Sequence, residues 1–428
     1  MARARGANAQ LCLAYETNYG TPPGSGYIKM PFVSSDLGEQ QNLITSDVLG
    51  YGRDPQDPVL DVINNEGNVA VPLDLRSTGD WLKLMMGAPT TTQGLAATGS
   101  YLFSAQPVNN SILTVNGQAI TFVTGTPIAN QVKIGTTLSD TIANAVIALN
   151  ASVVAGVAAA TYSADLAGTT ILIVHDTIGV AGNAFTIVAG SAPATNATAS
   201  GATLTGGAAT GPYNNVFVSG ATSLPSVSIE VGLVEVPSYG MNYGCMLNSF
   251  RVQLQRSGLL GAQLGLICQG EARAATTGAG APTTRVFERF TQFTGQIARD
   301  GVPLANIVSG SLQYSNGLDK IEVIRSDGRI GGSDAAEIAV TGDIVLRFAD
   351  TMLLNLAINN TPLELRFNWQ IAAQKSLLMV VHRVLLPKPK LPITGPNGVQ
   401  ATFNFQAAKD PVLAKTCTMT LVNDVNGY

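Results

Sequence analysis

Side chains able to do acid–base or nucleophilic chemistry are few in this sequence. It has two histidines, His175, which is followed by Asp176, and His382. A Ser–His–Asp arrangement would need distant partners that no motif marks. His175 lies at the end of a predicted strand, which is typical of a turn, and His382 matches Phe250 of an earlier segment, which indicates packing. Glycosidase-like carboxylate pairs have no fixed spacing in a sequence, and no pair stands out. We therefore predict no catalytic residues.

Metal and cofactor sites have equally little support. The cysteines are scattered without CxxC spacing, whereas a metal site needs clustered ligands. A disulfide framework is typical of short secreted chains, so we expect reduced, mostly buried thiols in a protein made in a cytoplasm. Neither GxxxxGK nor GxGxxG occurs, and we predict no metal and no cofactor. The cysteines are Cys12, Cys245, Cys268 and Cys417.

The composition favours an assembly protein with extensive β-sheet. Charged residues make up 12% of the 428 residues, against about 25% in typical domains. The net charge is −4, whereas a nucleic-acid binder carries a basic excess, and Lys388-Pro389-Lys390 is too short to bind nucleic acid alone. No run of about 18 apolar residues could span a bilayer, and the basic start lacks the apolar stretch of a signal peptide. We expect sheets covered by hydroxyls and by neighbouring subunits, and no membrane contact.

An internal repeat supplies the elements of the fold. Segments in the first part of the chain match later segments in the same order. The difference in residue number, the offset, changes little within the first two matches and within the last two. Each match alone is weak, because strand patterns recur easily, but together they predict one β-rich module used twice. The matches are Ser35-Asp36 with Ser315-Asn316, Gly67–Leu73 with Gly342–Phe348, Phe250–Leu254 with His382–Leu386, and Gly261–Glu271 with Gly398–Ala408.

The offset between matching residues falls sharply between Leu73 and Arg251, which indicates an insertion in the first copy. The second copy passes directly from Asn360 to Pro362, whereas the first leaves its helix at Gly87 and resumes near Leu224. No arginine lies between Arg76 and Arg251. We predict an inserted domain at 94–207, a first module at 1–93 and 208–298, and a second module at 299–428.

Local patterns predict that the insert is a small α+β domain. Asn116-Gly117 lies between two alternating segments and favours a type I′ hairpin over 113–123. A helix is expected from Thr136 to about Asn150, with apolar residues at helical spacing. Further strands are expected at 157–163, 169–175 and 184–188.

The two modules read as mainly β with one helix each, 77–86 and 350–357, covering one sheet. Ser77 and Asp80 have capping-box spacing, and Gly87 suits the left-handed residue that ends a helix. The expected strands are 216–219, 226–236, 245–255, 263–271, 285–292, 311–314, 320–325, 337–348, 363–371, 377–386, 400–406 and 416–421.

These residues resemble a known family. AYETNYGTPP, GEQQ, GYGRDPQDP, GNVAVPLDL and WLKLMMG resemble the N-terminal pattern of tail tube proteins of long-tailed, siphovirus-type bacteriophages. The stretches 395–403 and 418–424 resemble the family's last strands, and FSAQPVNNSILTVNGQAITFV with GATLTGG resembles a decorating domain inserted in phage tail proteins. The resemblance implies a β-sandwich or barrel module with a flanking helix. It also implies stacked rings of six modules, assembled in the host bacterial cytoplasm, whose lumen conducts DNA in the virion tail. The implied partners are the chain itself, a tape measure protein, and tail terminator and tip proteins.

Two modules per chain change the expected stoichiometry, since three chains would supply six modules and form a trimeric, pseudo-hexameric ring. A lumen that lets DNA slide should lack a basic lining. Polar positions on the candidate strands are therefore our lumen candidates, although they could equally face solvent or a neighbour. They are Gln253, Gln255, Gln263, Gln269, Gln400, Asn404 and Gln406.

The charged loop 34–61 suits a contact between stacked rings, although a solvated loop is an equally good interpretation. The insert should project outward, because a lumen position would block DNA. The candidate stacking residues are Asp36, Glu39, Asp47, Arg53, Asp54 and Asp57.

Two alternatives stay open at this point. One is another ring-forming phage protein, such as a tail terminator or neck component. The other is a surface carbohydrate-binding protein that reads glycans with its insert. The insert has few aromatic residues, mostly at core-like positions, which argues weakly against sugar stacking.

Overall fold

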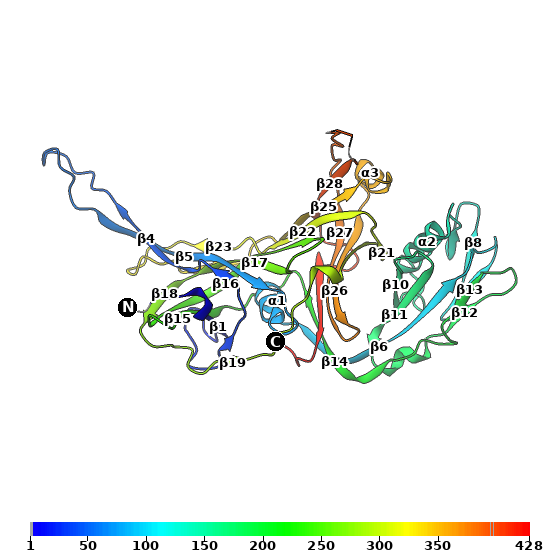
Figure 1. Ribbon diagram of the computed structural model, residues 1–428, viewed down its shortest axis with the longest axis horizontal. Helices are drawn as coiled ribbons and strands as arrows, with labels where there is room; N and C mark the ends of the chain where they lie inside the picture. Colours follow the sequence, from blue (N-terminus) through cyan, green and yellow to red (C-terminus); the bar gives the residue numbers. More distant parts are fainter. Residues whose placement is uncertain (1–2, 394, 397) are drawn as a thin grey trace.

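The computed structural model describes residues 3–393, 395–396 and 398–428. Met1, Ala2, Thr394 and Asn397, which belong to segments quoted above, lie outside them. The chain is mainly β, with 48% strand and 9% helix, which confirms the predicted fold class. Figure 1 shows an elongated molecule with a hairpin arm at one end, the 94–207 region at the other, and a long sheet between them.

The first copy pairs its strands in a branched order. β1 (Ala9–Tyr15) pairs with β15 (Val227–Leu233), and β15 pairs with the long β16 (Ser238–Gln255). One half of β16 then pairs with β18 (Gly270–Ala274), and the other half pairs with β17 (Gly261–Cys268). The order continues from β17 through β5 (Val59–Pro72) to β3 (Ser34–Ser35) and β4 (Gly38–Ile44).

The second copy repeats this order. β20 (Gly295–Arg299) pairs with β26 (Leu363–Ala372) and β26 with β27 (Lys375–Leu385). β27 branches to β29 (Cys417–Asn423) and to β28 (Gln400–Ala407). The order then continues through β25 (Ala339–Arg347) to β22 (Ile307–Ser315).

The two copies also share pairing registers. Met246 lies opposite Ile267, and Leu385 opposite Gln406, a shift of 139 residues in both strands. Ser34 lies opposite Ala70, and Ser309 opposite Val345, a shift of 275 residues in both strands. A bulge at the same place in both copies fixes the alignment. Cys245 and Asn242 flank it in β16, and Val384 and Val381 flank it in β27, again 139 residues apart. The shifts therefore define equivalent positions.

The registers correct three of the four sequence matches. Gly67–Leu73 and Gly342–Phe348 are equivalent at the shift of 275. Ser35 corresponds to Gly310 rather than Ser315, Gly261 to Gln400 rather than Gly398, and His382 to Tyr243 rather than Phe250. The matches slipped because alternating strands resemble themselves when displaced by a few residues.

The copies are joined by pairing between β16 and β22, and their cores are continuous. One hydrophobic cluster runs from Leu11 to Leu421 and contains residues of both copies and of helices α1 (Thr78–Met86) and α3 (Met352–Ile358). The remaining short elements are β2 (Ile28–Lys29), β19 (Thr283–Thr284), β21 (Val302–Pro303), β23 (Asp319–Ile321), β24 (Gly332–Asp334), η1 (Gly6–Asn8) and η3 (Gln292–Thr294).

A second hydrophobic cluster, from Ala97 to Leu204, forms the core of the insert. The predicted helix is α2 (Leu138–Asn150), with a capping box between Thr137 and Asp140. The predicted Asn-Gly hairpin joins β7 (Ile112–Val115) to β8 (Gln118–Val123) with positive φ at both turn residues. The other elements are β6 (Thr90–Phe103), β9 (Gln131–Lys133), β10 (Ala160–Ala164), β11 (Thr170–Ile178), η2 (Val180–Ala184), β12 (Ile187–Ala189), β13 (Ala197–Ala199) and β14 (Ala208–Val218).

Two predicted details near α1 are wrong. Ser77 makes no side-chain cap; instead Asp74 accepts its N–H, and Asp80 pairs with Arg285. The predicted strand 285–292 is an extended segment with only two isolated bridges, because Arg285 turns inward to Asp80 and Arg289 donates to the Leu260 carbonyl. Gly87 does end α1, with φ of 87°.

Two of the four cysteines form a disulfide, which corrects the prediction of reduced thiols. Cys245 in β16 and Cys268 in β17 face each other across the strand pair. Their separation of 23 residues carries no recognisable spacing, so only the register brings them together. Cys12 and Cys417 are free and buried.

Candidate functional site: a polar sheet face and a projecting arm

A continuous polar face extends over both copies. It covers six neighbouring strands, in the order β5, β17, β16, β22, β25 and β28. Residues directly opposite on paired strands share a face. One row across this face is Gln263, Arg251, Gln313, Thr341 and Gln406. The next row is Gln253, Ser311, Asp343 and Asn404.

The register brings six of the seven lumen candidates onto this polar face. They are exposed, while the alternating residues beneath them, such as Val252 and Phe403, are buried in the shared core. Gln269 is different: it is half-buried beyond the end of β17, and its Nε2 donates to the Gly331 carbonyl at 3.3 Å. The six on the face are Gln253, Gln255, Gln263, Gln400, Asn404 and Gln406.

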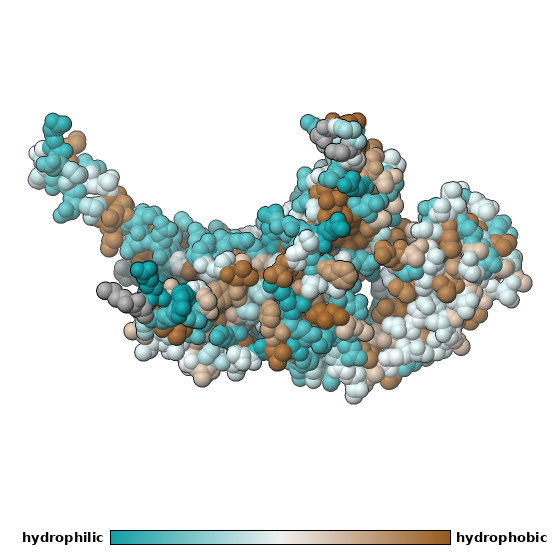
Figure 2. Space-filling view, in the orientation of Figure 1, coloured by the Kyte–Doolittle hydropathy of each residue, from teal (hydrophilic) through white to brown (hydrophobic). Residues whose placement is uncertain are grey.

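The polar face is rich in amides and hydroxyls and has few charges. Arg251 is exposed on it, and Asp343 accepts a hydrogen bond from the Ser311 hydroxyl. Arg347, opposite Gln400, is also exposed. In Figure 2 hydrophilic residues predominate along the concave outline between the arm and the tip of the molecule near α3, where Figure 1 places strands of this sheet. Charges of both signs and many neutral groups give this surface little grip on an anion.

The charged segment 34–61, expected to be a loop, is largely a hairpin, which we call the arm. β4 and the first part of β5 pair as far as Ile44 opposite Val59, and residues 45–58 form a loop beyond them. The arm projects from the body in Figure 1. Large apolar side chains are exposed near its end, including Leu49 at 91% and Tyr51 at 72%. Asp47, Arg53, Asp54 and Asp57 are exposed beside them, at the end of the arm.

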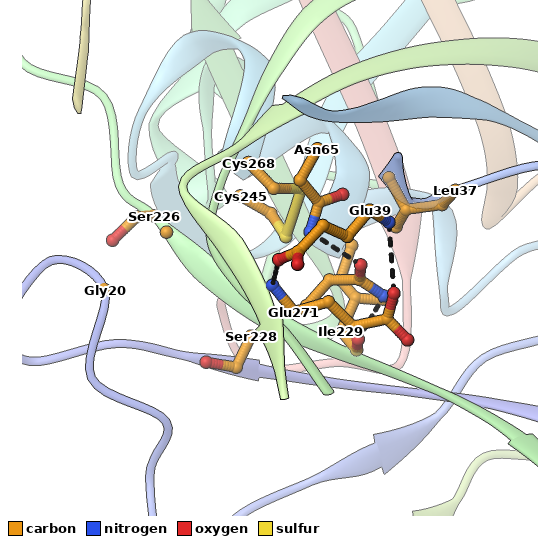
Figure 3. The surroundings of a disulfide bond; sticks show 12 residues. Gly20, Leu37, Glu39, Asn65, Ser226, Ser228, Ile229, Cys245, Cys268 and Glu271 are labelled. Atoms are coloured by element: carbon orange, nitrogen blue, oxygen red, sulfur yellow. Dashed lines mark hydrogen bonds between the residues drawn. A yellow bond between two sulfur atoms is a disulfide. The ribbon is translucent and has the colours of Figure 1, made fainter. Parts of the chain in front are cut away.

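The other two stacking candidates lie at the base of the arm. Asp36 accepts a hydrogen bond from the Asn68 N–H. Glu39 and Glu271 each accept the other's backbone N–H, at 3.0 and 2.9 Å, beside the Cys245–Cys268 disulfide (Figure 3). Arg329 of the second copy also bonds the Glu39 carboxylate, at 2.8 Å.

This network fixes where the arm leaves the body. Asn65 in β5 donates to Asn242 in β16 at 2.9 Å, in the same region. Strands β4, β5, β16 and β18 are thereby linked, together with a loop of the second copy. The base is held from both copies, while the end of the arm is exposed; no sequence pattern signalled this division.

The histidines have structural surroundings. His382 Nε2 lies 2.8 Å from the Thr418 hydroxyl, and its Nδ1 lies 3.5 Å from Glu364. Burial acts to raise the pKa of Glu364, but the hydrogen bonds from His382 and Arg366 hold it below its ordinary value. The three side chains link adjacent strands β26, β27 and β29, and Thr418 is only 9% exposed. The Thr177 N–H, two residues further along the chain, donates to His175 Nδ1 at 3.1 Å.

Comparison with known proteins identifies the family. Among the residues described, no helix has the length and apolar character needed to cross a membrane. No curated protein matches the chain. A family model described as "Phage tail tube protein" matches residues 6–407, which is nearly the whole chain. The chain therefore belongs to the phage tail tube protein family and is a structural protein of the virion tail that assembles into a tube.

Proposed function

We propose that three chains form each ring of the tail tube and that the polar face lines its lumen. The division into two modules and an insert supports this stoichiometry. The observation that carries it is the repeated strand order, with equal registers, joined within one chain by β16 and β22. One chain thereby supplies two consecutive sectors, and three chains supply the six sectors of the ring.

The polar face suits the passage of DNA. Sliding requires that phosphates are not held, and a surface of amides and hydroxyls offers weak, interchangeable hydrogen bonds instead of a row of cations. The six face residues named above line this path in the proposed tube, and Gln269 does not. DNA is conducted during ejection without specific binding.

The arm supplies the contact between stacked rings. Exposed apolar groups of this size on a projecting hairpin are costly in water and gain stability when a neighbour covers them. Asp47, Arg53, Asp54 and Asp57 form the polar surroundings of that contact. Asp36 and Glu39 hold the base of the arm and have no direct part in it.

The insert lies on the outside of the tube. Its core is separate from the shared core and contains no residue of the polar face. The tube encloses a tape measure protein during assembly in the host bacterial cytoplasm, and it ends at tail terminator and tip proteins.

Electron cryo-microscopy of purified tubes, averaged without imposed symmetry, tests the stoichiometry. The expected map has threefold symmetry, with three inserts per ring on alternate sectors. Six equivalent inserts per ring would contradict the trimer. Isolated rings that do not stack into tubes would favour a role as a tail terminator or neck component.

A further inference from the structure

We infer that residues 388–393 form a docking edge for strand β3–β4, residues 34–40, of a second copy of this chain. This inference rests on the proposed ring and assigns the two surfaces that meet between chains. The template is the joint that the chain already makes with itself.

The internal joint is an antiparallel pairing of β16 with β22. It runs without a shift from Ser249 opposite Ser315 to Gln255 opposite Ser309. The apolar residues of both strands at this joint, such as Val252 and Leu312, lie fully buried in the shared core. It therefore joins the copies through both backbone pairing and side-chain packing.

The shared registers transfer this joint to the outer ends of the chain. The shift of 139 takes 249–254 of β16 to 388–393, directly after β27. Subtracting the shift of 275 from 309–315 of β22 gives 34–40, in β3 and β4. Leu391 packs against the shared core as Val252 does. Ile393, at the position of the buried Leu254, is 81% exposed and has no cover within its own chain.

Both transferred edges lack a strand partner within the described parts of the chain. β3 and β4 pair only with β5, and 388–393 forms no strand. Unpaired edges bind other strands readily. Pro387, Pro389 and Pro392 remove N–H donors from one edge, which limits pairing with unrelated strands and leaves the N–H groups of β3–β4 as the main donors.

The predicted register matches side chains of compatible chemistry. The internal pair Val252–Leu312 corresponds to Leu391 opposite Leu37 in the proposed joint, and Leu37 is itself buried in the core. Arg251 opposite Gln313 becomes Lys390 opposite Gly38. Gly38 has no side chain, so the Lys390 ammonium can extend across it to Glu66.

The edge of β3–β4 is acidic where the lysines arrive. Gly38 lies opposite Glu66, and Asp36, Glu39 and Glu66 line a polar hollow of about 350 Å³ at this edge. Arg329 bonds Glu39 and Lys320 bonds Glu66 at 2.7 Å, but the Glu66 side chain is 53% exposed and can accept a second cation. Lys388 and Lys390 are exposed on the other edge. Opposite charges on the two edges favour pairing between chains and disfavour pairing of like edges.

Disulfide trapping tests the register. Residues directly opposite on antiparallel strands have Cα atoms about 4.5–5.5 Å apart, so Gly38→Cys with Lys390→Cys should cross-link neighbouring chains in oxidised tubes. We expect covalent dimers and trimers on a non-reducing gel. The matched control, Asn42→Cys with Lys390→Cys, moves one thiol four residues along β4 and should give at most a tenth of that product.

A charge reversal covers the case in which the cysteine variant does not assemble. Lys390→Glu should raise the concentration needed for assembly about tenfold, because the new carboxylate would face Glu66, and Glu66→Lys should reverse the effect in the double variant. Lys409→Glu, at another exposed lysine, should leave assembly unchanged.

The outcomes separate this inference from the proposed ring. Threefold tubes without the Gly38–Lys390 cross-link, or with the control cross-link instead, would overturn the edge assignment alone. Sixfold tubes would overturn the ring itself. If Lys390→Glu assembled normally, the proposed charge pairing would be wrong.

Discussion

Gln253 lies directly opposite Ser311 at the pairing that joins the two copies of the fold. Because this pair is flanked by Val252 opposite Leu312, both buried, the polar face and the shared core cross the joint together. In the proposed ring, one contact between modules is therefore part of a single chain's folded body. The two copies should therefore unfold as one unit, separately from the insert.

Truncations in the two cores test this separation. Leu312→Ala, in the shared core, should lower the unfolding free energy of the two-copy body by about 3 kcal/mol and leave the insert's transition in place. Leu149→Ala, in the insert core, should lower the unfolding free energy of the insert by a similar amount and leave the transition of the two-copy body in place. Differential scanning calorimetry measures both transitions, and a joint shift of both would show that the cores are coupled.

Asp80 should make stability depend on pH. Burial raises its pKa to about 6, although Arg285 opposes the shift. The unfolded carboxyl ionises near pH 4, so between pH 4 and 6 the unfolded state releases its proton first. The contribution of Asp80 to stability is therefore greatest below pH 4 and falls as the pH rises through 6, by about 2–3 kcal/mol.

The matched variant is Asp80→Asn, which cannot ionise. Urea unfolding of the unassembled chain at several pH values should show the wild type losing stability relative to Asp80→Asn between pH 4 and 7. A constant difference between the two proteins across this range would show that folding does not raise the pKa of Asp80.

Sequence reasoning succeeded where chemistry is local and failed where pairing is distant. The Asn116-Gly117 turn and α2 follow from residues a few positions apart, and both are present. The match between Gly67–Leu73 and Gly342–Phe348 was in register, whereas the match of Gly261 with Gly398 slipped by two residues although both of its segments also begin with glycine.

Other features depend on contacts between distant residues. The β16–β22 pairing, the Cys245–Cys268 disulfide and the Glu39–Arg329 ion pair are set by strand register and packing. Alternation places the polar glutamines on one face of each strand, but only register shows that six of them share one surface. Gln269 fits the alternation of β17, yet the strand ends at Cys268 and its side chain turns to Gly331.

Thiol counting tests the cysteine assignment. Burial raises the pKa of Cys12 to about 11 and that of Cys417 to about 12, and the thiolate is the reactive form. We expect no labelling by a maleimide in the native chain, two labels after unfolding, and four after unfolding with a reductant. Mass spectrometry reads each state, and four labels without the reductant would contradict the disulfide.

Deleting residues 94–207 should leave tube formation intact. β6 and β14 still pair outside the deletion, with Gln93 opposite Tyr213, so a short Asn-Gly turn can join 93 to 208. The deletion removes the hydrogen bond from the Ala164 N–H to the Gly301 carbonyl and the packing of Val302 against the insert core. Negative-stain microscopy should show thinner tubes of normal length; failure to form tubes would make the insert part of assembly.

The end of the arm should control stacking without affecting ring closure. Leu49→Ser with Tyr51→Ser removes two of its most exposed apolar side chains, which contact nothing that holds the body together. Transfer of such side chains out of water contributes about 1.5–3 kcal/mol each, so every ring boundary loses several such contributions while the sheet edges are unchanged. We expect rings or short stacks in native mass spectrometry and no long tubes.

Ile128→Ser, at an exposed position of the insert, is the matched control and should give normal tubes. Long tubes from the arm variant would exclude its apolar tip from the stacking contact, and loss of rings as well would place the arm within the ring.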